Sequence, residues 1–109
     1  MFKGLGDLAN LAREAGKIKE RVEALQAELA EREVESSSGG GMVTVRVNGR
    51  QEILSVSIGP EILESGDRQM LEDLVTAAAN AALARSKEMM REELAKIAGG
   101  LNISLPGLI

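Results

Sequence analysis

An apolar residue recurs at alternating steps of three and four along the first third of the chain, and this periodicity restricts the fold more than any other feature. The positions are Leu8, Leu11, Ala15, Ile18, Val22, Leu25 and Leu29. Such a heptad pattern is typical of a long helix that packs lengthwise against another helix. We therefore predict a helix over residues 7–32, with Asp7 as its N-cap and Gly16 as a weak point inside it.

The next apolar pattern has a period of two, which is typical of β-strands. Valines alternate with other side chains over 43–47, and the alternation returns over 54–58. The preceding stretch, 32–37, suits a short edge strand. We predict a small three-stranded antiparallel sheet over residues 33–58.

The loop between the two apolar strands decides which residues pair. A two-residue turn would place Val45 opposite a glutamate. A four-residue loop over 48–51 instead places Val45 opposite Leu54 and Val43 opposite Val56. Because register follows the hydrophobic pattern, we predict the longer loop.

Two further helices follow the sheet. Pro60 suits the first position of a short helix over 60–64. Asp67 is a suitable N-cap for a long helix over 67–97, which would end before a pair of glycines. The last residues, 98–109, form an apolar tail to which the pattern assigns no place in the fold.

The stretch SSSGGG, residues 36–41, raises the question of a phosphate-binding loop. A Walker loop needs Lys followed by Ser or Thr after its glycines, and then a helix. A dinucleotide fingerprint also lies between a strand and a helix. Here the glycines precede a strand and no lysine follows them. We predict a corner between two strands, without a nucleotide site.

Composition excludes several classes of function. At 109 residues the chain fits a single α+β domain, residues 1–109. The absence of Cys and His removes thiol nucleophiles, the commonest general base and the commonest metal ligands. No apolar run approaches the ~20 residues that span a bilayer. We expect a cytoplasmic protein with no enzymatic activity, catalytic residue, cofactor, metal, membrane contact or small-molecule substrate.

The predicted helices are too long for one compact protomer. A helix of 26 residues measures about 39 Å, whereas a compact domain of this size is roughly 35 Å across. One small sheet cannot cover both apolar stripes, so we predict a twofold homodimer. A monomeric helical hairpin with the sheet at its base is the alternative. The residues expected at the dimer interface are Leu11, Ile18, Val22 and Leu25.

The distribution of charge matters more than its total. A net charge of −4 argues against nucleic acid as a partner. However, residues 1–21 carry a net charge of +2 and residues 85–97 carry +1, whereas residues 22–84 carry −7. One end of each long helix is therefore mildly basic.

The basic residues of the first helix form a ladder. Arg13, Lys17 and Arg21 are four residues apart and share a helix face, which fits either an anionic partner or an ordinary solvated surface. Since Phe2 is the only aromatic residue, the chain has no platform for stacking single-stranded bases, and any contact should be to duplex DNA. The candidate DNA-binding residues are Lys3, Arg13, Lys17, Lys19, Arg21, Arg85, Lys87 and Arg91.

Nearly the whole chain resembles the YbaB/EbfC family of small bacterial nucleoid-associated proteins. The resemblance rests on the FKG start, the heptad helix, "MVTVRVNGR", "LSVSIGPEIL", "MLEDLVTAAANAAL" and the closing "LPGL". One departure is Gly59, where the family usually has aspartate before the proline. The resemblance implies a tweezer-like homodimer whose helical arms bind DNA in the nucleoid and affect chromosome organisation or gene regulation. The alternative is a non-catalytic protein-interaction scaffold associated with DNA repair.

Overall fold

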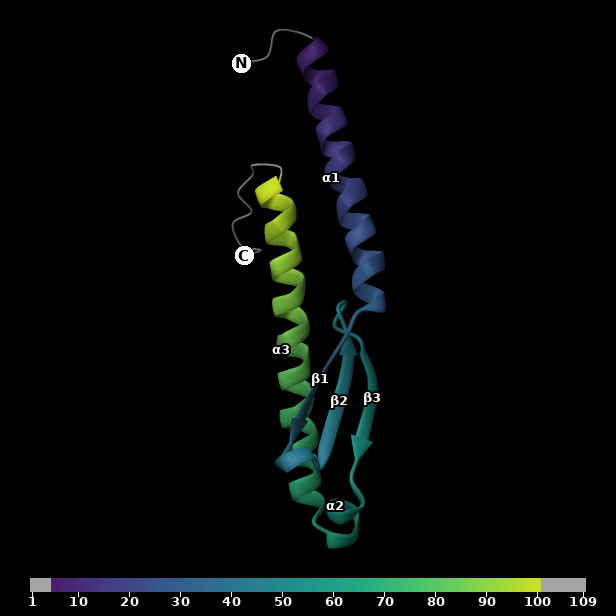
Figure 1. Ribbon diagram of the computed structural model, residues 1–109, viewed down its shortest axis with the longest axis vertical. Coiled ribbons are helices and arrows are strands. Elements are labelled where there is room, and N and C mark those ends of the chain that lie inside the picture. Colours follow the sequence, from purple (N-terminus) through teal and green to yellow (C-terminus); the bar gives the residue numbers. More distant parts are fainter. Residues whose placement is uncertain (1–4, 101–109) are drawn as a thin grey trace.

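The computed structural model describes residues 5–100 and confirms the predicted α+β architecture. Figure 1 shows the sheet packed against the first half of the second long helix, and the first long helix beside its other half. The molecule is elongated, with extents of 72 × 22 × 17 Å. Its elements are α1 (Leu5–Glu31), β1 (Glu33–Ser38), the 3₁₀ turn η1 (Gly39–Gly41), β2 (Val43–Asn48), β3 (Ile53–Ile58), α2 (Pro60–Ser65) and α3 (Arg68–Gly100).

The ends of the two long helices differ from the prediction. α1 begins before Asp7, which therefore lies in its first turn and is not its N-cap. α3 begins as predicted, because Asp67 Oδ1 accepts the backbone N–H of Met70 at 3.0 Å. It continues through Gly99 and Gly100, however, because neither glycine takes the left-handed backbone that would end a helix.

The SSSGGG stretch forms the predicted corner between two strands. Gly39, Gly40 and Gly41 have φ angles of 60°, 67° and 96°, which only glycine adopts readily. A Cβ atom on Gly39 would lie 2.9 Å from the Leu74 side chain, so the corner also packs closely on α3. Ser38 Oγ fixes this contact by donating to the Leu74 carbonyl at 2.6 Å.

The sheet is antiparallel in the order β1-β2-β3, but the predicted register between β2 and β3 is wrong. Val45 pairs with Val56, and Val43 pairs with Ile58, two residues away from the prediction. A slip of two residues leaves every side chain on the same face of the sheet. The hydrophobic pattern alone therefore fits both registers.

Asn48 sets the observed register through the turn. Its backbone N–H donates to the Glu52 carbonyl at 3.0 Å, which closes a loop of three residues in place of four. Its side-chain Oδ1 accepts the backbone N–H groups of Arg50 at 3.0 Å and Glu52 at 3.1 Å, and Gln51 takes a left-handed φ of 65°. A bulge at Leu54 then brings the strands into their observed pairing.

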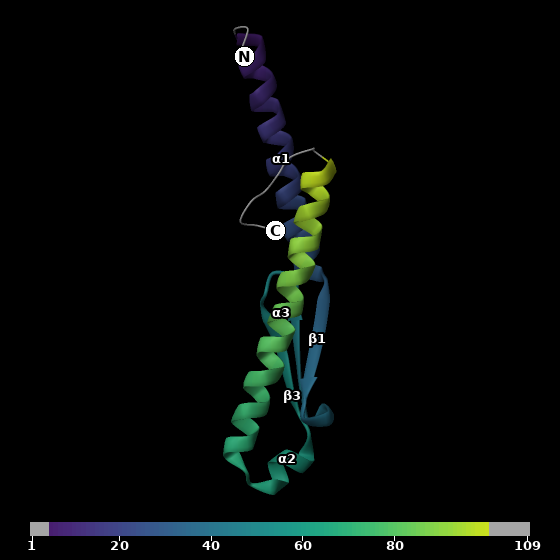
Figure 2. The same ribbon diagram turned by 90° about the vertical axis from the view of Figure 1, so that its left-hand side faces the viewer.

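Two apolar clusters hold the helices in place. The first joins α3 to the sheet through small side chains, Ala78 and Ala82, which let the helix backbone approach β2 closely. The second joins α1 to the C-terminal half of α3 through Leu25, Leu29 and Met89. In Figure 2, α3 crosses in front of the sheet and continues beyond it toward α1. α3 is therefore the element that connects both clusters.

Candidate nucleic-acid interface

The N-terminal part of α1 projects beyond the end of α3 (Figure 1). Gly100, the last described residue of α3, lies beside Arg21, since a Cβ on Gly100 would be 3.8 Å from Arg21 Nη1. The apolar residues on the projecting part of α1, which we call the α1 stripe, are only partly covered. Leu8 is 51% exposed and Leu11 is 49% exposed. The α1 stripe comprises Leu8, Leu11, Ala15, Ile18 and Val22.

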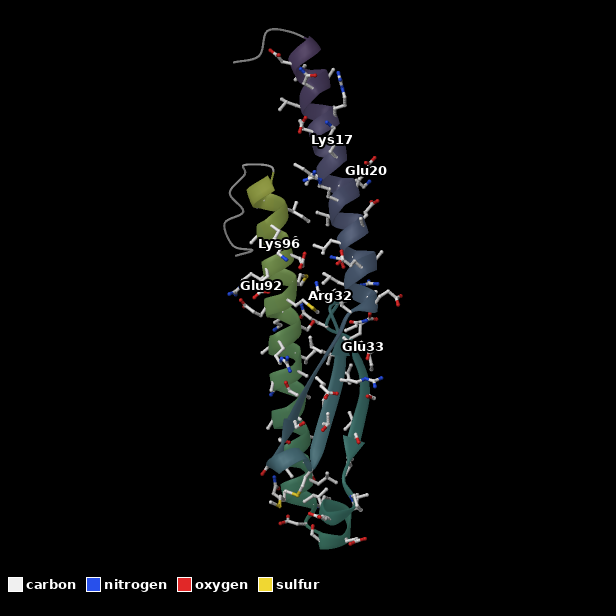
Figure 3. The ribbon with its side chains drawn as sticks, viewed as in Figure 1. Lys17, Glu20, Arg32, Glu33, Glu92 and Lys96 are labelled. Carbon is white, nitrogen blue, oxygen red and sulfur yellow. The ribbon has the colours of Figure 1, made fainter. Side chains whose placement is uncertain are left out.

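The three cations of the predicted ladder are exposed on the same projecting helix. Arg13, Lys17 and Arg21 are four residues apart, so each is rotated by only about 40° from the previous one, on a different side of α1 from the stripe. Figure 3 shows Lys17 on the part of α1 that lies past the end of α3. α1 therefore has an apolar side and a second side, which we call the basic side, where these three cations outnumber Glu20, the acid beside Lys17 and Arg21.

The candidate DNA-binding residues differ in whether they already form an ion pair with a carboxylate. Within residues 5–100, Arg13, Arg21 and Lys87 form no ion pair. Three other candidate residues form ion pairs within a single helix: Lys17 with Glu14 at 3.7 Å, Lys19 with Glu23 at 4.0 Å, and Arg91 with Glu88 at 3.5 Å. Exposed ion pairs of this kind contribute only about 0–1 kcal/mol, so each cation can exchange its carboxylate for another anion.

Two of the predicted DNA-binding residues stand apart from the others. Arg85 donates a hydrogen bond to the Glu35 carbonyl and so ties α3 to β1. This contact engages Arg85 Nη1 within the protomer. Lys3 lies outside the described residues.

The predicted dimer-interface residues also fall into two groups, one in the core of the protomer and one on its surface. Leu25 is only 5% exposed and packs against Met89 inside the protomer. Leu11 is exposed, and Ile18 and Val22 are partly buried on the α1 stripe. The structure therefore brings three of the four residues to one surface and places the fourth in the core.

A groove of about 330 Å³ separates α1 from the end of α3. Its wall includes Glu93, whose carboxylate accepts from Lys96 Nζ at 3.1 Å and from Arg32 Nη1 at 3.2 Å. These two hydrogen bonds, first that of Lys96 and then that of Arg32, hold the pKa of Glu93 below its usual value. The remaining lining residues are Arg21, Ala24, Leu25, Glu28 and Ile97.

The sequence analysis did not assign Arg32 or Lys96 to any site. The spacing of Glu93 and Lys96, three residues apart on one helix, could have indicated their pairing. No sequence signal links Arg32 to Glu93, which lies 61 residues away along the chain. Figure 3 shows Arg32 at the base of α1 and Lys96 on the facing helix.

Neither a metal centre nor a membrane-spanning helix occurs within the described part of the chain. No group of three or more Asp or Glu residues there could hold a metal ion. None of the helices is both long and apolar enough to cross a bilayer.

Comparison with known proteins confirms the resemblance seen in the sequence. The family model described as the YbaB/EbfC DNA-binding family matches residues 4–101. A nucleoid-associated protein of Caldanaerobacter subterraneus is 45% identical over 107 residues, covering 98% of this chain and 95% of the relative. Another, from Myxococcus xanthus, is 50% identical over 102 residues, covering 94% and 95%.

A solved structure has the same fold. The crystal structure of the uncharacterized protein HP0035 from Helicobacter pylori superposes with a TM-score of 0.75. The alignment covers 82% of this chain and 94% of that one, at 24% sequence identity. At this identity the likeness concerns the fold alone.

Proposed function

Because the chain belongs to the YbaB/EbfC DNA-binding family, we propose that it binds duplex DNA as a non-catalytic homodimer, through the cations of its two long helices. We place it in the bacterial nucleoid, in the cytoplasm, with a role in chromosome organisation or gene regulation. The observation that carries the proposal is the basic side of α1, where Arg13 and Arg21 are exposed and have no ion-pair partner among the described residues. Cations on such a surface neutralise phosphates and carry no sequence information directly, so any preference for a site would come from DNA shape.

The candidate contacts rank by how freely each cation can reach a phosphate. Arg13, Arg21 and Lys87 come first, because no carboxylate in the described part holds them. Lys17, Lys19 and Arg91 come next, since each would exchange a weak surface ion pair for a phosphate. Arg85 comes last.

The large surface of the protomer supports the homodimer. The chain exposes 7479 Å², whereas a compact monomer of 11.5 kDa exposes about 5,800 Å². Its radius of gyration is 20.4 Å, against about 13 Å for a compact chain of this length. An excess of roughly 1,700 Å² per protomer is on the scale that stable homodimers bury.

The α1 stripe remains our proposed contact between the two copies, through Leu11, Ile18 and Val22. An aspartate at Ile18 would place a charge in this apolar contact, which costs several kcal/mol when it has no partner. We expect Ile18→Asp to weaken the dimer while the sheet stays folded. Light scattering on the variant and the wild type measures this directly, and a folded Ile18→Asp dimer of unchanged stability would remove the α1 stripe from the interface.

A salt titration of duplex binding tests the function. Each cation that neutralises a phosphate contributes about 0.9 to the slope of log affinity against log salt. Replacing Arg13, Lys17 and Arg21 with glutamine should weaken binding to all duplexes alike and flatten the slope by up to about 2.7 per protomer.

A second triple variant supplies the control, with glutamine at Arg46, Arg50 and Arg68. It removes the same charge from the sheet, the β2–β3 turn and the start of α3, and we expect wild-type affinity and slope. A folded α1 variant that binds like the wild type would reject the arm contacts. If the wild type itself showed no salt-dependent binding to duplex DNA, the scaffold interpretation would replace this proposal.

A further inference from the structure

Ala98, near the end of α3, is buried although it faces away from the rest of the described fold. It is only 3% exposed. The sheet and α1 both lie on one side of α3 (Figure 1), where Ala82 and Met89 belong to the two apolar clusters. At about 100° per residue, Ala98 is rotated by about 160° from Ala82 and by about 180° from Met89. It belongs to neither cluster.

The other residues on this side of α3 are exposed. Four of them lie within about 40° of Ala98 around the helix, and we call the five together the outer side of α3: Asn80, Ala84, Lys87, Arg91 and Ala98. Figure 2 looks onto this side of the helix. Ala84 is the closest comparison, because it has the same side chain and nearly the same direction, yet it is exposed. Burial of Ala98 therefore requires a cover that Ala84 lacks.

Two segments of the sequence lie outside the described residues, and only one of them can reach Ala98. Residues 1–4 precede α1, whose first 16 residues lead from there to Arg21 over about 24 Å. Four residues extend over at most about 14 Å, so they fall short of the end of α3. Residues 101–109 instead follow Gly100, which lies beside Arg21 and two residues after Ala98. They are the segment within reach.

The sequence of residues 101–109 fits an apolar surface. Apolar and polar side chains alternate over its first five residues, which is typical of a segment with one buried side. No side chain of the segment is charged, so packing against α3 would bury no unpaired charged side chain. The apolar side of the segment consists of Leu101, Ile103 and Leu105, and its polar side consists of Asn102 and Ser104.

We propose that residues 101–109 fold back on the outer side of α3 in their own chain, with their apolar side against Ala98. The inference goes beyond the proposed function and rests neither on DNA binding nor on the homodimer. Nine residues extend over as much as about 30 Å, whereas the last ten residues of α3 occupy about 15 Å. The segment can therefore reverse direction and still cover the last turns of the helix. Ala98 is already buried within a single chain, which favours this segment over a second copy.

The end of α3 is a place where such a contact would stabilise the helix. α3 continues through Gly99 and Gly100, although glycine is the poorest helix former after proline. Arg21 of α1 approaches this last turn from one side only. A segment packed on the outer side would hold the turn from the other.

Thiol reactivity measures the cover directly. The chain contains no cysteine, so Ala98→Cys and Ala84→Cys each introduce a single thiol on the outer side of α3. Both variants of the full chain are treated with an aromatic disulfide reagent, and the reaction is followed by absorbance. We expect Ala98→Cys to react at least about tenfold more slowly, because the reagent reaches its thiol only when the segment opens. Equal rates for the two thiols would show that nothing covers this position and would overturn the proposal.

Two double substitutions in the Ala98→Cys protein then identify the cover. Ile103→Asp with Leu105→Asp places two charges on the apolar side of the segment, whereas Asn102→Asp with Ser104→Asp places the same charges on its polar side. Neither pair changes a residue of the described helices or sheet, and circular dichroism checks that both proteins are folded. We expect the first pair to raise the rate to that of the exposed control thiol, and the second pair to leave it slow.

Two results would assign the cover elsewhere. A rate that stays slow with Ile103→Asp and Leu105→Asp would overturn residues 101–109 as the occupant. A rate for Ala98→Cys that falls as the protein concentration rises would assign the cover to a second copy and would overturn the contact within one chain. A slow rate that is independent of concentration and is restored only by the charges on the apolar side would support the proposal.

Discussion

At the scale of single residues, Asn48 fixes the β2–β3 turn and its contacts with both long helices. It is 4% exposed, yet both ends of its amide are satisfied. Its Nδ2 donates to Glu52 Oε1 at 2.8 Å and to the Ala30 carbonyl at 3.4 Å, and the hydroxyl of Ser86 donates to its backbone carbonyl at 2.8 Å. One residue therefore connects the β2–β3 turn to α1 and α3.

Asn48→Ala should destabilise the protein. The substitution removes the side-chain acceptor of the Arg50 and Glu52 backbone N–H groups and the donor to the Ala30 carbonyl, and each lost hydrogen bond costs about 0.5–1.5 kcal/mol. Urea unfolding followed by circular dichroism measures the loss. Asn80→Ala, on the exposed side of α3, is the control and should change stability by no more than about 0.5 kcal/mol. Equal stability of the two variants would show that the turn does not depend on this side chain.

Glu93 should make stability depend on pH in a defined direction. Its pKa is lowered by Lys96 and then by Arg32, so the folded state binds this proton more weakly than the unfolded state does. The contribution is therefore present above the usual glutamate pKa of about 4.3 and is lost as the pH falls below that value, through the lower folded pKa.

The comparison of Glu93→Gln with wild type isolates this contribution. The variant should be less stable at neutral pH, and the difference should shrink as the pH falls below the glutamate range. Glu92→Gln, on the exposed neighbour, should show no such convergence. A difference that stays constant down to low pH would mean that the effect of Glu93→Gln comes from packing and not from charge.

At the scale of elements, the tip of the β2–β3 hairpin docks on the end of α1. Gly49 N–H donates to the Leu29 carbonyl at 2.8 Å and to the Arg32 carbonyl at 2.9 Å. A Cβ on Gly49 would lie 2.7 Å from Leu29 Cδ2. The hairpin therefore supports the base of α1 at the point where the chain leaves the helix.

Two glycine-to-alanine substitutions should act in opposite directions. Gly49→Ala would overpack the docked hairpin and cost about 1–3 kcal/mol. Gly16→Ala, inside α1, has nothing within 4 Å of the added Cβ and should stabilise the helix by roughly 0.5–1 kcal/mol. Thermal unfolding compares the two with wild type. A stabilised Gly49→Ala variant would show that the hairpin does not press against α1.

The elements could be predicted because each follows from a local period, whereas their connections could not. The heptad spacing identified α1, and the alternation of valines identified β2. The β2–β3 register depended on the hydrogen bonds of Asn48, which leave no mark in a pattern of period two. The placement of the candidate DNA-binding residues was predictable to the same extent: the shared face of the α1 ladder followed from its spacing, but the hydrogen bond from Arg85 to the Glu35 carbonyl depends on tertiary contact.

At the scale of the whole molecule, the cations of α1 lie far from the exposed aliphatic residues of the sheet. The basic side of α1 lies at one end of a particle 72 Å long, whereas Ile53, Val56 and Ile58 lie along the sheet toward the other end. The proposed homodimer would hold two sets of cations, one from each copy. Each set alone neutralises few phosphates, so binding should depend strongly on both copies contacting one duplex.

The salt dependence of binding should therefore halve in a monomeric variant. The slope of log affinity against log salt is proportional to the number of phosphates neutralised, at about 0.9 for each. If Ile18→Asp is monomeric, only one α1 contacts the duplex at a time, and we expect about half the wild-type slope together with much weaker binding. Ser57→Asp, at an exposed position of β3, is the charge-matched control: it adds the same negative charge away from α1 and should keep the wild-type slope. Fluorescence anisotropy on a short duplex over a range of salt concentrations measures all three proteins. An unchanged slope for a folded, monomeric Ile18→Asp variant would mean that a single protomer makes every phosphate contact, because the second set of cations would then contribute nothing to the counterions released.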